Sequence, residues 1–312
     1  MNHQPVQGLT LREAVNKMRG NTGKVVHLTL FRKGLRKPFT VQLKCEAIQV
    51  QSIKGRWLSP HFAYIRIGSF QETTRKDLDK FLHALQENPN NSLQGLILDL
   101  RNNPGGLLTT AAEVANAFLD SKQMQYQQLL VYTQGNTPQA NMRIVAKDHD
   151  QKYKGALVVL INQGTASGAE IVAGALQDNK RAVVVGTKSF GKGSVQSVIP
   201  LDEISALKLT TALYYTPSGR SIQAAGIVPD ITLNELKVNF LDERGLDAIY
   251  LHESELKGHL SNNKNQPVNQ KTSLKPSSAI ETNELLRNDY QLFEAFNVLK
   301  SLVVLQNTAN KA

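Results

Sequence analysis

The chain has 312 residues, of which 41% are hydrophobic and 6% aromatic, and its formal net charge at pH 7 is +10. This length is enough for one large domain or two smaller ones, and the apolar fraction is enough for a core. The single cysteine, Cys45, excludes an internal disulfide and a cysteine-based metal site. The basic residues are scattered and rarely lie near aromatic ones, which favours a solvated basic surface over a nucleic-acid site.

Membrane-spanning and export segments are not expected. No stretch of the sequence approaches the about 20 apolar residues of a transmembrane helix. Residues 1–8 have neither the basic nor the apolar region of a signal peptide.

The first elements form a small group. Residues 9–20 are predicted to form an amphipathic helix with Thr10 as its N-cap. Residues 24–31 and 39–44 are predicted to be two strands of a hairpin. These few apolar residues cannot form a core alone. We therefore expect them to be part of a domain.

From about Trp57 onward, strands alternate with helices, which indicates an α/β core. The polar segment 133–153 is predicted to be a mobile loop, and residues 261–281 are predicted to be disordered. Residues 289–305 are predicted to form a C-terminal helix that docks on the core. The predicted strands are 62–67, 95–100, 128–132, 156–161, 181–185, 195–199 and 206–215, and the predicted core helices are 73–85, 107–119 and 171–178.

The stretch Asn162–Glu170 lies between an apolar strand and a helix and consists mostly of small residues. This pattern places Ser167 at a helix N-terminus, where unpaired N–H groups and the helix dipole stabilise negative charge. Ser167 is therefore a candidate nucleophile. A serine in this position is also a common N-cap, and the stretch alone favours that simpler reading.

A catalytic serine needs a base, and no histidine of the chain lies in a triad-like local motif. Lys192 follows Ser167 by one strand and lies between Gly191 and Gly193. In an α/β sheet, the loop after the next strand returns to the same edge. A lysine acts as a base only when burial favours its neutral form, so we expect Lys192 to be buried. The alternative is an ordinary exposed loop lysine.

The same loop partly matches a phosphate-binding motif. Residues 186–192 fit the first seven positions of G-x-x-x-x-G-K-[ST] and follow a strand. However, Gly193 replaces the hydroxyl residue, and the next residues predict a strand, whereas a P-loop must begin a helix. Nucleotide binding is therefore disfavoured.

Five segments carry a resemblance to a known family: Tyr64–Phe70, Gly95–Leu108, Asn162–Ile171, Val185–Gln196, and Tyr215–Arg220 with Gly226–Asp230. In this order they resemble the carboxy-terminal processing peptidases, also called tail-specific proteases. The resemblance covers roughly residues 9–233 and implies a crotonase-like (ClpP/crotonase) α/β protease core at 57–233. It also implies a Ser–Lys serine endopeptidase that cleaves unfolded or extended proteins near their C-termini and needs no cofactor or metal.

The resemblance assigns roles to individual residues. Ser167 would be the nucleophile, and Lys192 the general base that later protonates the leaving amine. Gln196 would orient that lysine without adding charge, although a solvent-facing strand residue is the simpler reading. The backbone N–H groups of Gly168 and Gly106 would form the oxyanion hole.

Asp178 occupies a position sometimes regarded as an additional polar residue of the site. It is equally the last-turn residue of its helix, and that interpretation is favoured.

The resemblance further implies a PDZ domain before the core, of which residues 1–45 resemble only the C-terminal half. The chain is therefore expected to be truncated at its N-terminus, with residues 234–312 as a C-terminal extension. The resemblance implies location in the periplasm or cell envelope, substrates that are unfolded or have exposed C-termini, and an adaptor protein as a further candidate partner. Without an export signal, a cytoplasmic truncated product is the alternative location. Two rival functions are an inactive peptide-binding scaffold and an acyl-CoA-processing enzyme with the shared core fold.

Overall fold

The computed structural model describes residues 6–46, 51–88, 92–148, 150–202, 205–234 and 289–309. The chain forms two compact units, Met1–Gln51 and Ser52–Ala312. The segment 261–281, predicted to be disordered, lies outside the described residues.

The first unit contains helix α1 (Leu11–Met18) and an antiparallel hairpin of β1 (Val25–Leu30) and β2 (Phe39–Lys44). The predicted N-cap is confirmed, because the Thr10 N–H donates to Glu13 Oε2 at 2.8 Å and the Glu13 N–H donates to Thr10 Oγ1 at 3.3 Å. Helix α1 buries none of its residues. The predicted helix and strands are therefore present, with little apolar core.

The second unit is built on a six-stranded sheet with the order β12-β9-β8-β5-β4-β3. Neighbouring strands from β4 to β12 are parallel, and only β3 runs antiparallel to its neighbour. All residues of β5 and β8 are buried, as expected for central parallel strands covered on both faces. The strands are β3 (Ile53–Ser59), β4 (Phe62–Ile67), β5 (Gly95–Asp99), β8 (Ala156–Ile161), β9 (Val183–Gly186) and β12 (Ile231–Thr232).

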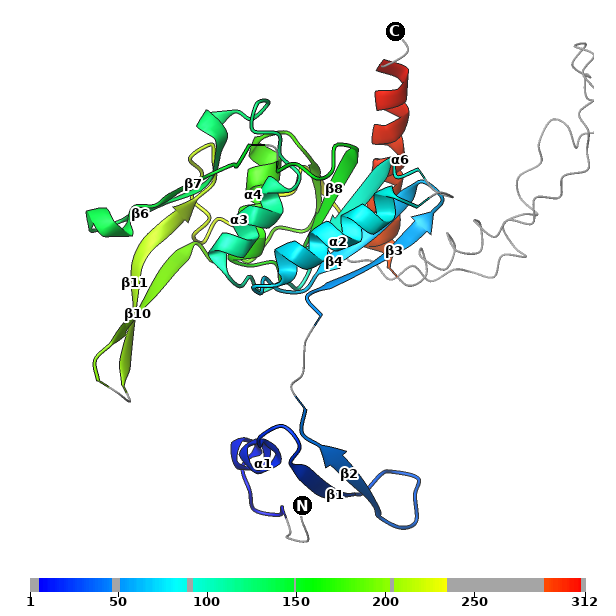
Figure 1. Ribbon diagram of the computed structural model, residues 1–312, viewed down its shortest axis with the longest axis vertical. Coiled ribbons are helices and arrows are strands. Elements are labelled where there is room, and N and C mark those ends of the chain that lie inside the picture. Colours follow the sequence, from blue (N-terminus) through cyan, green and yellow to red (C-terminus); the bar gives the residue numbers. More distant parts are fainter. Residues whose placement is uncertain are drawn as a thin grey trace, which may run out of the picture. The chain divides into compact units, whose positions relative to one another are not determined.

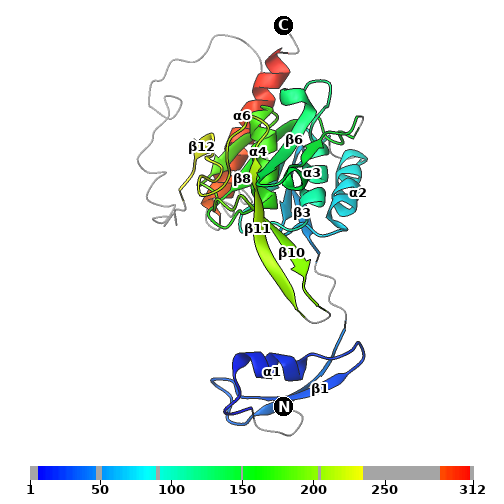
Figure 2. The same ribbon diagram turned by 90° about the vertical axis from the view of Figure 1, so that its left-hand side faces the viewer.

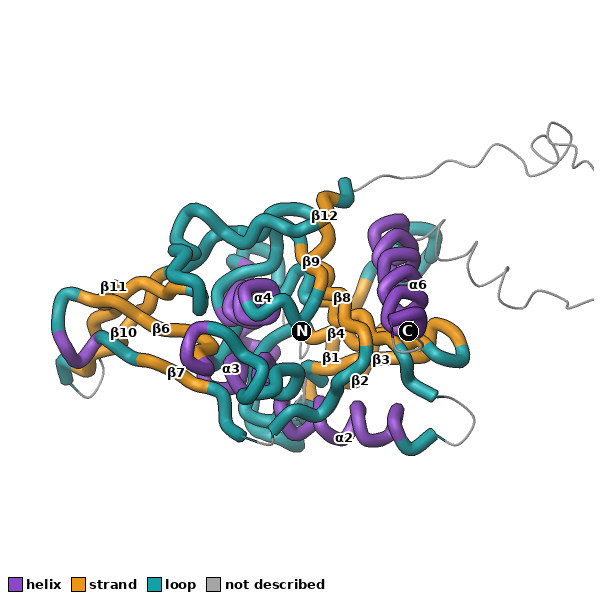
Figure 3. The backbone as a smooth tube through the Cα atoms, turned by 90° about the horizontal axis from the view of Figure 1, so that it is seen from above, coloured by secondary structure: helices purple, strands orange, loops and turns teal. Residues whose placement is uncertain are grey.

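Helices cover both faces of this sheet (Figures 1 and 3). Successive side chains of a strand point to opposite faces. Thus Leu98 and Val159 pack in the cluster shared with α2, α3 and α4, whereas Ile97 and Val158 pack with Phe296 of α6. The predicted C-terminal helix therefore does dock on the core. The helices are α2 (Thr74–Gln86), α3 (Leu108–Asn116), α4 (Gly168–Asp178) and α6 (Tyr290–Ala309).

A second, four-stranded antiparallel sheet has the order β10-β11-β6-β7. Figure 2 shows β10 and β11 as a long hairpin, and the first half of β11 is exposed. The short helices η1 and η2 flank β6. These elements are η1 (Tyr126–Gln128), β6 (Leu129–Gly135), η2 (Pro138–Ala140), β7 (Arg143–Val145), β10 (Ser194–Pro200) and β11 (Ala206–Tyr215).

The segment 133–153 was predicted to be a mobile loop, and that prediction is wrong. It contains the end of β6, η2 and β7, and its polar side chains make specific contacts. Both guanidinium nitrogens Nη1 and Nη2 of Arg75 donate to Asp150, at 2.7 and 2.8 Å. The polar composition suggested solvation, whereas these partners lie far away in the sequence.

The parallel sheet brings three loops together. The carboxyl ends of β5, β8 and β9 are neighbours, so the loops that follow them lie at one edge, which is where α/β sheets commonly bind ligands. These loops are 100–107, 162–167 and 187–193. Among the described residues, no helix has the length and apolar character that crossing a membrane requires.

Candidate active site

Ser167 has an unusual backbone for a helix cap. Its φ and ψ are 54° and −118°, whereas the ordinary cap Thr10 has −66° and 157°. A left-handed backbone costs an L-residue about 1–2 kcal/mol. Such strain persists where the surroundings impose it, and it clusters at functional sites. The backbone of Ser167 therefore argues against a role limited to capping α4.

The loop after β5 contains two glycines with positive φ, of which Gly105 (φ 103°) packs directly against Ser167 and Gly106 (φ 144°) packs against the backbone of Phe70. A Cβ atom on Gly105 would lie 2.9 Å from the Ser167 Cβ and 3.0 Å from the Gly168 nitrogen. Only glycine allows this approach. The Ala166 N–H donates to the carbonyl oxygen of Asn103 at 2.9 Å, which fixes the two loops to each other.

Two backbone donors near Ser167 are unused. The Gly105 N–H donates to Asn103 Oδ1 at 2.8 Å, and the Ser167 N–H donates to Glu170 Oε2 at 2.7 Å. By contrast, the N–H groups of Gly106 and Gly168 have no hydrogen-bond acceptor within the described ranges. These are the two donors that the sequence predicted for an oxyanion hole, and both are available to a ligand oxygen.

Glu170 joins the serine loop to the lysine loop, and its residue surface is 0% exposed. Its Oε2 accepts the N–H of Ser167 at 2.7 Å and that of Lys192 at 2.9 Å. Its Oε1 accepts the Ser189 hydroxyl and the Gly191 N–H, both at 2.6 Å. A buried carboxylate is costly unless its oxygens are hydrogen-bonded, and these four donors meet that need.

Glu170 is not among the site residues that the sequence predicts, although it contacts both loops. The available signal was the Ser-x-x-Glu spacing from Ser167 to Glu170, which is that of a capping box. That spacing explains the contact with the Ser167 N–H, but it does not reveal the three contacts made by Ser189, Gly191 and Lys192 in the loop after β9.

The expected burial of Lys192 is not found, because its side chain is exposed. The loop itself is fixed: the Phe190 N–H donates to the Thr165 carbonyl oxygen, and the Ala224 N–H to that of Gly191, both at 2.9 Å. The hydrogen bond from the Lys192 N–H to Glu170 fixes the backbone of Lys192.

Gln196 lies on β10 beside a bulge, where the pairing shifts between Val195 and Gln196. Its side chain is exposed. Within the described part of the chain, no hydrogen bond joins it to Lys192. The two side chains, four residues apart in the sequence, are therefore not hydrogen-bonded to each other in this structure.

Asp178 lies at the far end of α4 from Ser167, and an eleven-residue helix is about 16 Å long. Its Oδ2 accepts the Ser218 N–H at 2.8 Å, and its Oδ1 forms an ion pair with Arg220. These contacts attach the end of α4 to the turn after β11. They agree with the interpretation of Asp178 as a residue of the last helical turn.

An ion-pair network lies immediately before the glycine turn. Arg101 Nη2 donates to the buried Asp99 at 2.8 Å and to Asp289, next to α6, at 2.6 Å. Burial alone would raise the pKa of Asp289, but the hydrogen bonds and charge of Arg101 outweigh it, so this pKa lies below its usual value. Burial, together with the charge of Asp99, raises the pKa of Tyr64, which donates to Asp99 at 2.8 Å.

The geometry suits nucleophilic chemistry on a carbonyl group. It supplies a hydroxyl at a strained strand-to-helix turn, two unused N–H donors and a lysine-bearing loop fixed to the serine loop. Within the described ranges, no group of three or more His, Cys, Asp or Glu side chains is arranged to hold a metal ion.

Comparisons with known proteins point the same way. The model of a family described as peptidase family S41 matches residues 61–233. A carboxy-terminal-processing protease of Bartonella bacilliformis is 42% identical over 297 residues, which are 95% of this chain and 64% of the relative. A carboxyl-terminal-processing protease of Synechocystis sp. is 35% identical over 76% of this chain and 54% of its own length.

Among solved structures, a photosystem II D1 C-terminal processing protease is 29% identical with a TM-score of 0.52. The match covers 75% of this chain and 61% of that one. The chain thus spans between about half and two thirds of the length of these relatives.

Proposed function

This chain belongs to peptidase family S41, and from that membership we propose that it is a serine endopeptidase that cleaves unfolded or extended proteins at or near their C-termini. The observation that carries the proposal is the strained backbone of Ser167 next to the unused N–H groups of Gly106 and Gly168. Acyl transfer needs a nucleophile and oxyanion donors arranged in this way. The names of the matched relatives support C-terminal processing as the kind of cleavage.

The reaction proceeds in two stages. Ser167 Oγ attacks the scissile carbonyl carbon while its proton passes to the Nζ of neutral Lys192. The carbonyl oxygen becomes an oxyanion between the N–H groups of Gly106 and Gly168. Lys192 then protonates the leaving amine, the peptide C–N bond breaks, and water hydrolyses the ester on Ser167.

Because the side chain of Lys192 is exposed in the free chain, its desolvation must come from the bound substrate. An ammonium group cannot accept a proton, and removal of water favours the neutral amine. A polypeptide bound over the loop 187–193 would exclude water from Lys192 at the moment when the base is needed. Gln196 would then orient the amine through its amide oxygen, which adds no charge.

We extend the proposal to the domains. Residues 57–233 form a crotonase-like core, and residues 234–312 form a C-terminal extension that ends in α6. Residues 1–45 form the C-terminal half of a PDZ domain, since α1 resembles its groove helix and the β1–β2 hairpin resembles its last strands. Location in the periplasm or cell envelope and the use of an adaptor protein rest on the family resemblance alone. A scaffold without activity is not favoured, because the matched relatives are proteases.

The test uses the chain as it stands with an unfolded protein that ends in small apolar residues, and follows the fragments by mass. Ser167→Ala and Lys192→Ala should each lower cleavage by about 10³-fold or more, and Gln196→Ala by about tenfold. Lys192→Arg should be as inactive as Lys192→Ala, because arginine stays charged and cannot act as a base. The control is Val304→Asp, a substitution on the exposed side of α6.

Labelling with a serine-directed electrophile gives a second readout that needs no protein substrate. The label should attach to Ser167, and Ser167→Ala should remain unlabelled. Attachment of the label to another residue, or undiminished cleavage by Ser167→Ala, would overturn the assignment.

A further inference from the structure

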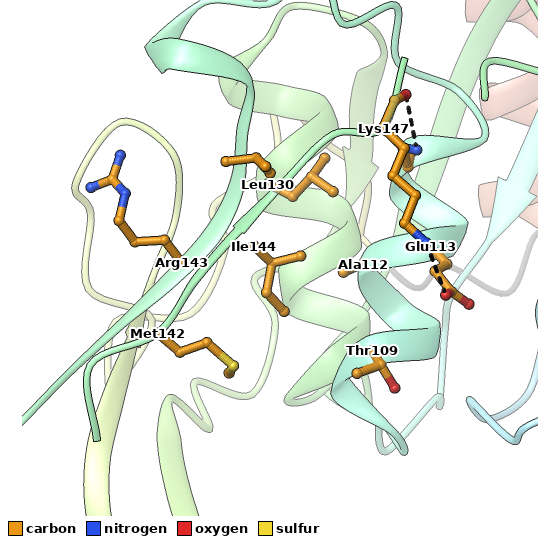
Figure 4. Close-up of a pocket in the computed structure, with 10 residues that line it drawn as sticks. Thr109, Ala112, Glu113, Leu130, Met142, Arg143, Ile144 and Lys147 are labelled. Atoms are coloured by element: carbon orange, nitrogen blue, oxygen red, sulfur yellow. Dashed lines mark hydrogen bonds and ion pairs between the residues drawn. The ribbon is translucent and has the colours of Figure 1, made fainter. Parts of the chain in front are cut away.

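A groove lies between α3 and the edge strand β7, beside the proposed site. It is lined by Thr109, Ala112, Asn116, Leu130, Met142 and Ile144, among others, and its cavity has a volume of about 320 Å³. Figure 4 shows Met142 and Ile144 extending toward α3 and Arg143 extending away from it. The α3–β7 groove therefore has an apolar wall on the sheet side.

β7 is an open edge. It is the last strand of its sheet and pairs only with β6. The Met142 carbonyl oxygen accepts from β6 at 2.8 Å, and the Ala146 N–H donates to the residue before β6 at 2.8 Å. Because backbone groups alternate in direction along a strand, those of Arg143 and Val145 face outward, where no described residue pairs with them. Such an edge is a template for one more strand.

The groove leads away from the proposed oxyanion turn. Thr109 lies in the first turn of α3, three residues after Gly106. At the other end, Lys147 and Glu113 approach each other to 3.9 Å, as drawn in Figure 4. A chain that occupied the groove would therefore lie about one helical turn from the donors that hold the reacting carbonyl.

One polar group lining the groove lacks a partner. Asn116 is 2% exposed, and its Nδ2 donates to Asp150 at 2.7 Å. Its Oδ1 is the one buried side-chain oxygen or nitrogen of the described residues without a hydrogen bond. An unpaired buried acceptor costs about 1–3 kcal/mol, so the wall of the groove contains one unsatisfied polar group.

We propose that the α3–β7 groove binds an extended segment of the protein substrate, which adds to β7 as a further strand and places an apolar side chain in the cavity. This inference rests on the proposed function. The size of the site indicates what occupies it. Two outward-facing residues on β7 and a cavity of about 320 Å³ are enough to bind one short extended segment. A stable dimer of this chain would need about 800 Å² of surface from each partner.

Binding is measured with the Ser167→Ala chain, so that the probe is not cleaved. The probe is a fluorescein-labelled peptide in which leucine alternates with serine, and the readout is fluorescence anisotropy. Met142→Asp places a charge at the rim, where Met142 is 40% exposed, and should weaken binding about tenfold or more. Arg143→Pro removes one outward N–H and should weaken it several-fold. Val304→Asp on α6, the matched control, should bind like the parent, and thermal unfolding verifies the fold of each variant.

The outcomes separate the two proposals. If the parent does not bind the peptide, or if Met142→Asp binds it as tightly as the parent, the groove proposal is wrong even if Ser167 is catalytic. Met142→Asp can weaken binding of the peptide while the chain with intact Ser167 cleaves no protein. In that case the groove proposal is supported and the protease proposal fails. A dimer in light scattering that dissociates on Met142→Asp would show that a second copy, not a substrate, occupies the groove. In a cleaving chain, Met142→Asp should raise KM for unfolded protein and leave kcat nearly unchanged.

Discussion

Ser167 and Lys192 donate their backbone N–H groups to the same carboxylate oxygen, Oε2 of Glu170, at 2.7 and 2.9 Å. The two residues are 25 positions apart in the sequence and lie on loops after different strands. One buried side chain thus holds the backbones of the proposed nucleophile and the proposed base close to each other.

Substitution of Glu170 tests this arrangement. Glu170→Gln keeps the shape but turns an NH₂ group toward N–H donors, so the two loops should shift apart. A displacement of about 1 Å costs roughly 10²-fold in rate, and we expect a loss of this size in kcat with a smaller change in KM. Steady-state cleavage and the rate of Ser167 labelling measure it. Ser189→Ala, which removes one of the four donors, should have a milder effect, and wild-type kinetics for Glu170→Gln would refute the positioning role.

Gly105→Ala should lower activity far more than it lowers stability. Its Cβ would lie 2.9 Å from the Ser167 Cβ and so displace the serine. Gly219→Ala is a matched control. The φ of Gly219, 91°, is also left-handed, but an added Cβ would lie 3.7 Å from the nearest atom. Both variants should lose about 1–2 kcal/mol of unfolding free energy from backbone strain. Only Gly105→Ala should lose cleavage by about 10²-fold; equal activity of the two variants would contradict the packing argument.

Asp178→Ala should act on stability rather than on chemistry. It removes the acceptor for the Ser218 N–H and the partner of Arg220, at the far end of α4 from Ser167. The loss of unfolding free energy should be about 1–3 kcal/mol, as for a charged hydrogen-bond partner. Denaturant unfolding and kcat are measured on the same preparation. A fall in kcat without a fall in stability would instead give Asp178 a place in the reaction.

Asp289 should make the second unit sensitive to acid. Its pKa is lowered in the folded state, so its contribution is complete above the unfolded value of about 3.9 and is lost as the pH falls through the lower folded value. We expect Asp289→Asn to be about 1–2 kcal/mol less stable than the parent at pH 7. This difference should shrink below about pH 4. Urea unfolding at several pH values measures the gap, and a gap that does not change with pH would exclude the Arg101–Asp289 pair as its source.

The sequence predicted the parts of the fold whose patterns are local. Strands such as 62–67 and 156–161 are short apolar runs, and buried parallel strands have this composition. The strand–turn–helix around Ser167 was predicted for the same reason, because small residues separate two apolar patterns. The Thr10 cap is equally local.

Other features depend on partners distant in the sequence. The sequence of strand β7 predicts a loop, since its pairing with β6 is not visible in its own composition. The sequence around Glu170 indicates only a capping box. The fold brings the N–H groups of Gly191 and Lys192 to its carboxylate oxygens. The exposure of Lys192 depends on which distant segments pack over its loop. The local sequence pattern contains no information about such packing.

The placement of α6 has a consequence for synthesis of the protein on the ribosome. Residues such as Ile97 and Val158 form the sheet face that α6 covers with Phe296 and its neighbours. Translation adds about 5–20 residues per second, so α6 emerges several seconds after β9. During that interval the nascent chain presents an apolar sheet face to its surroundings. The moment of greatest risk of aggregation is therefore expected before the last helix is made, and a chaperone that binds exposed apolar strands would act on this face.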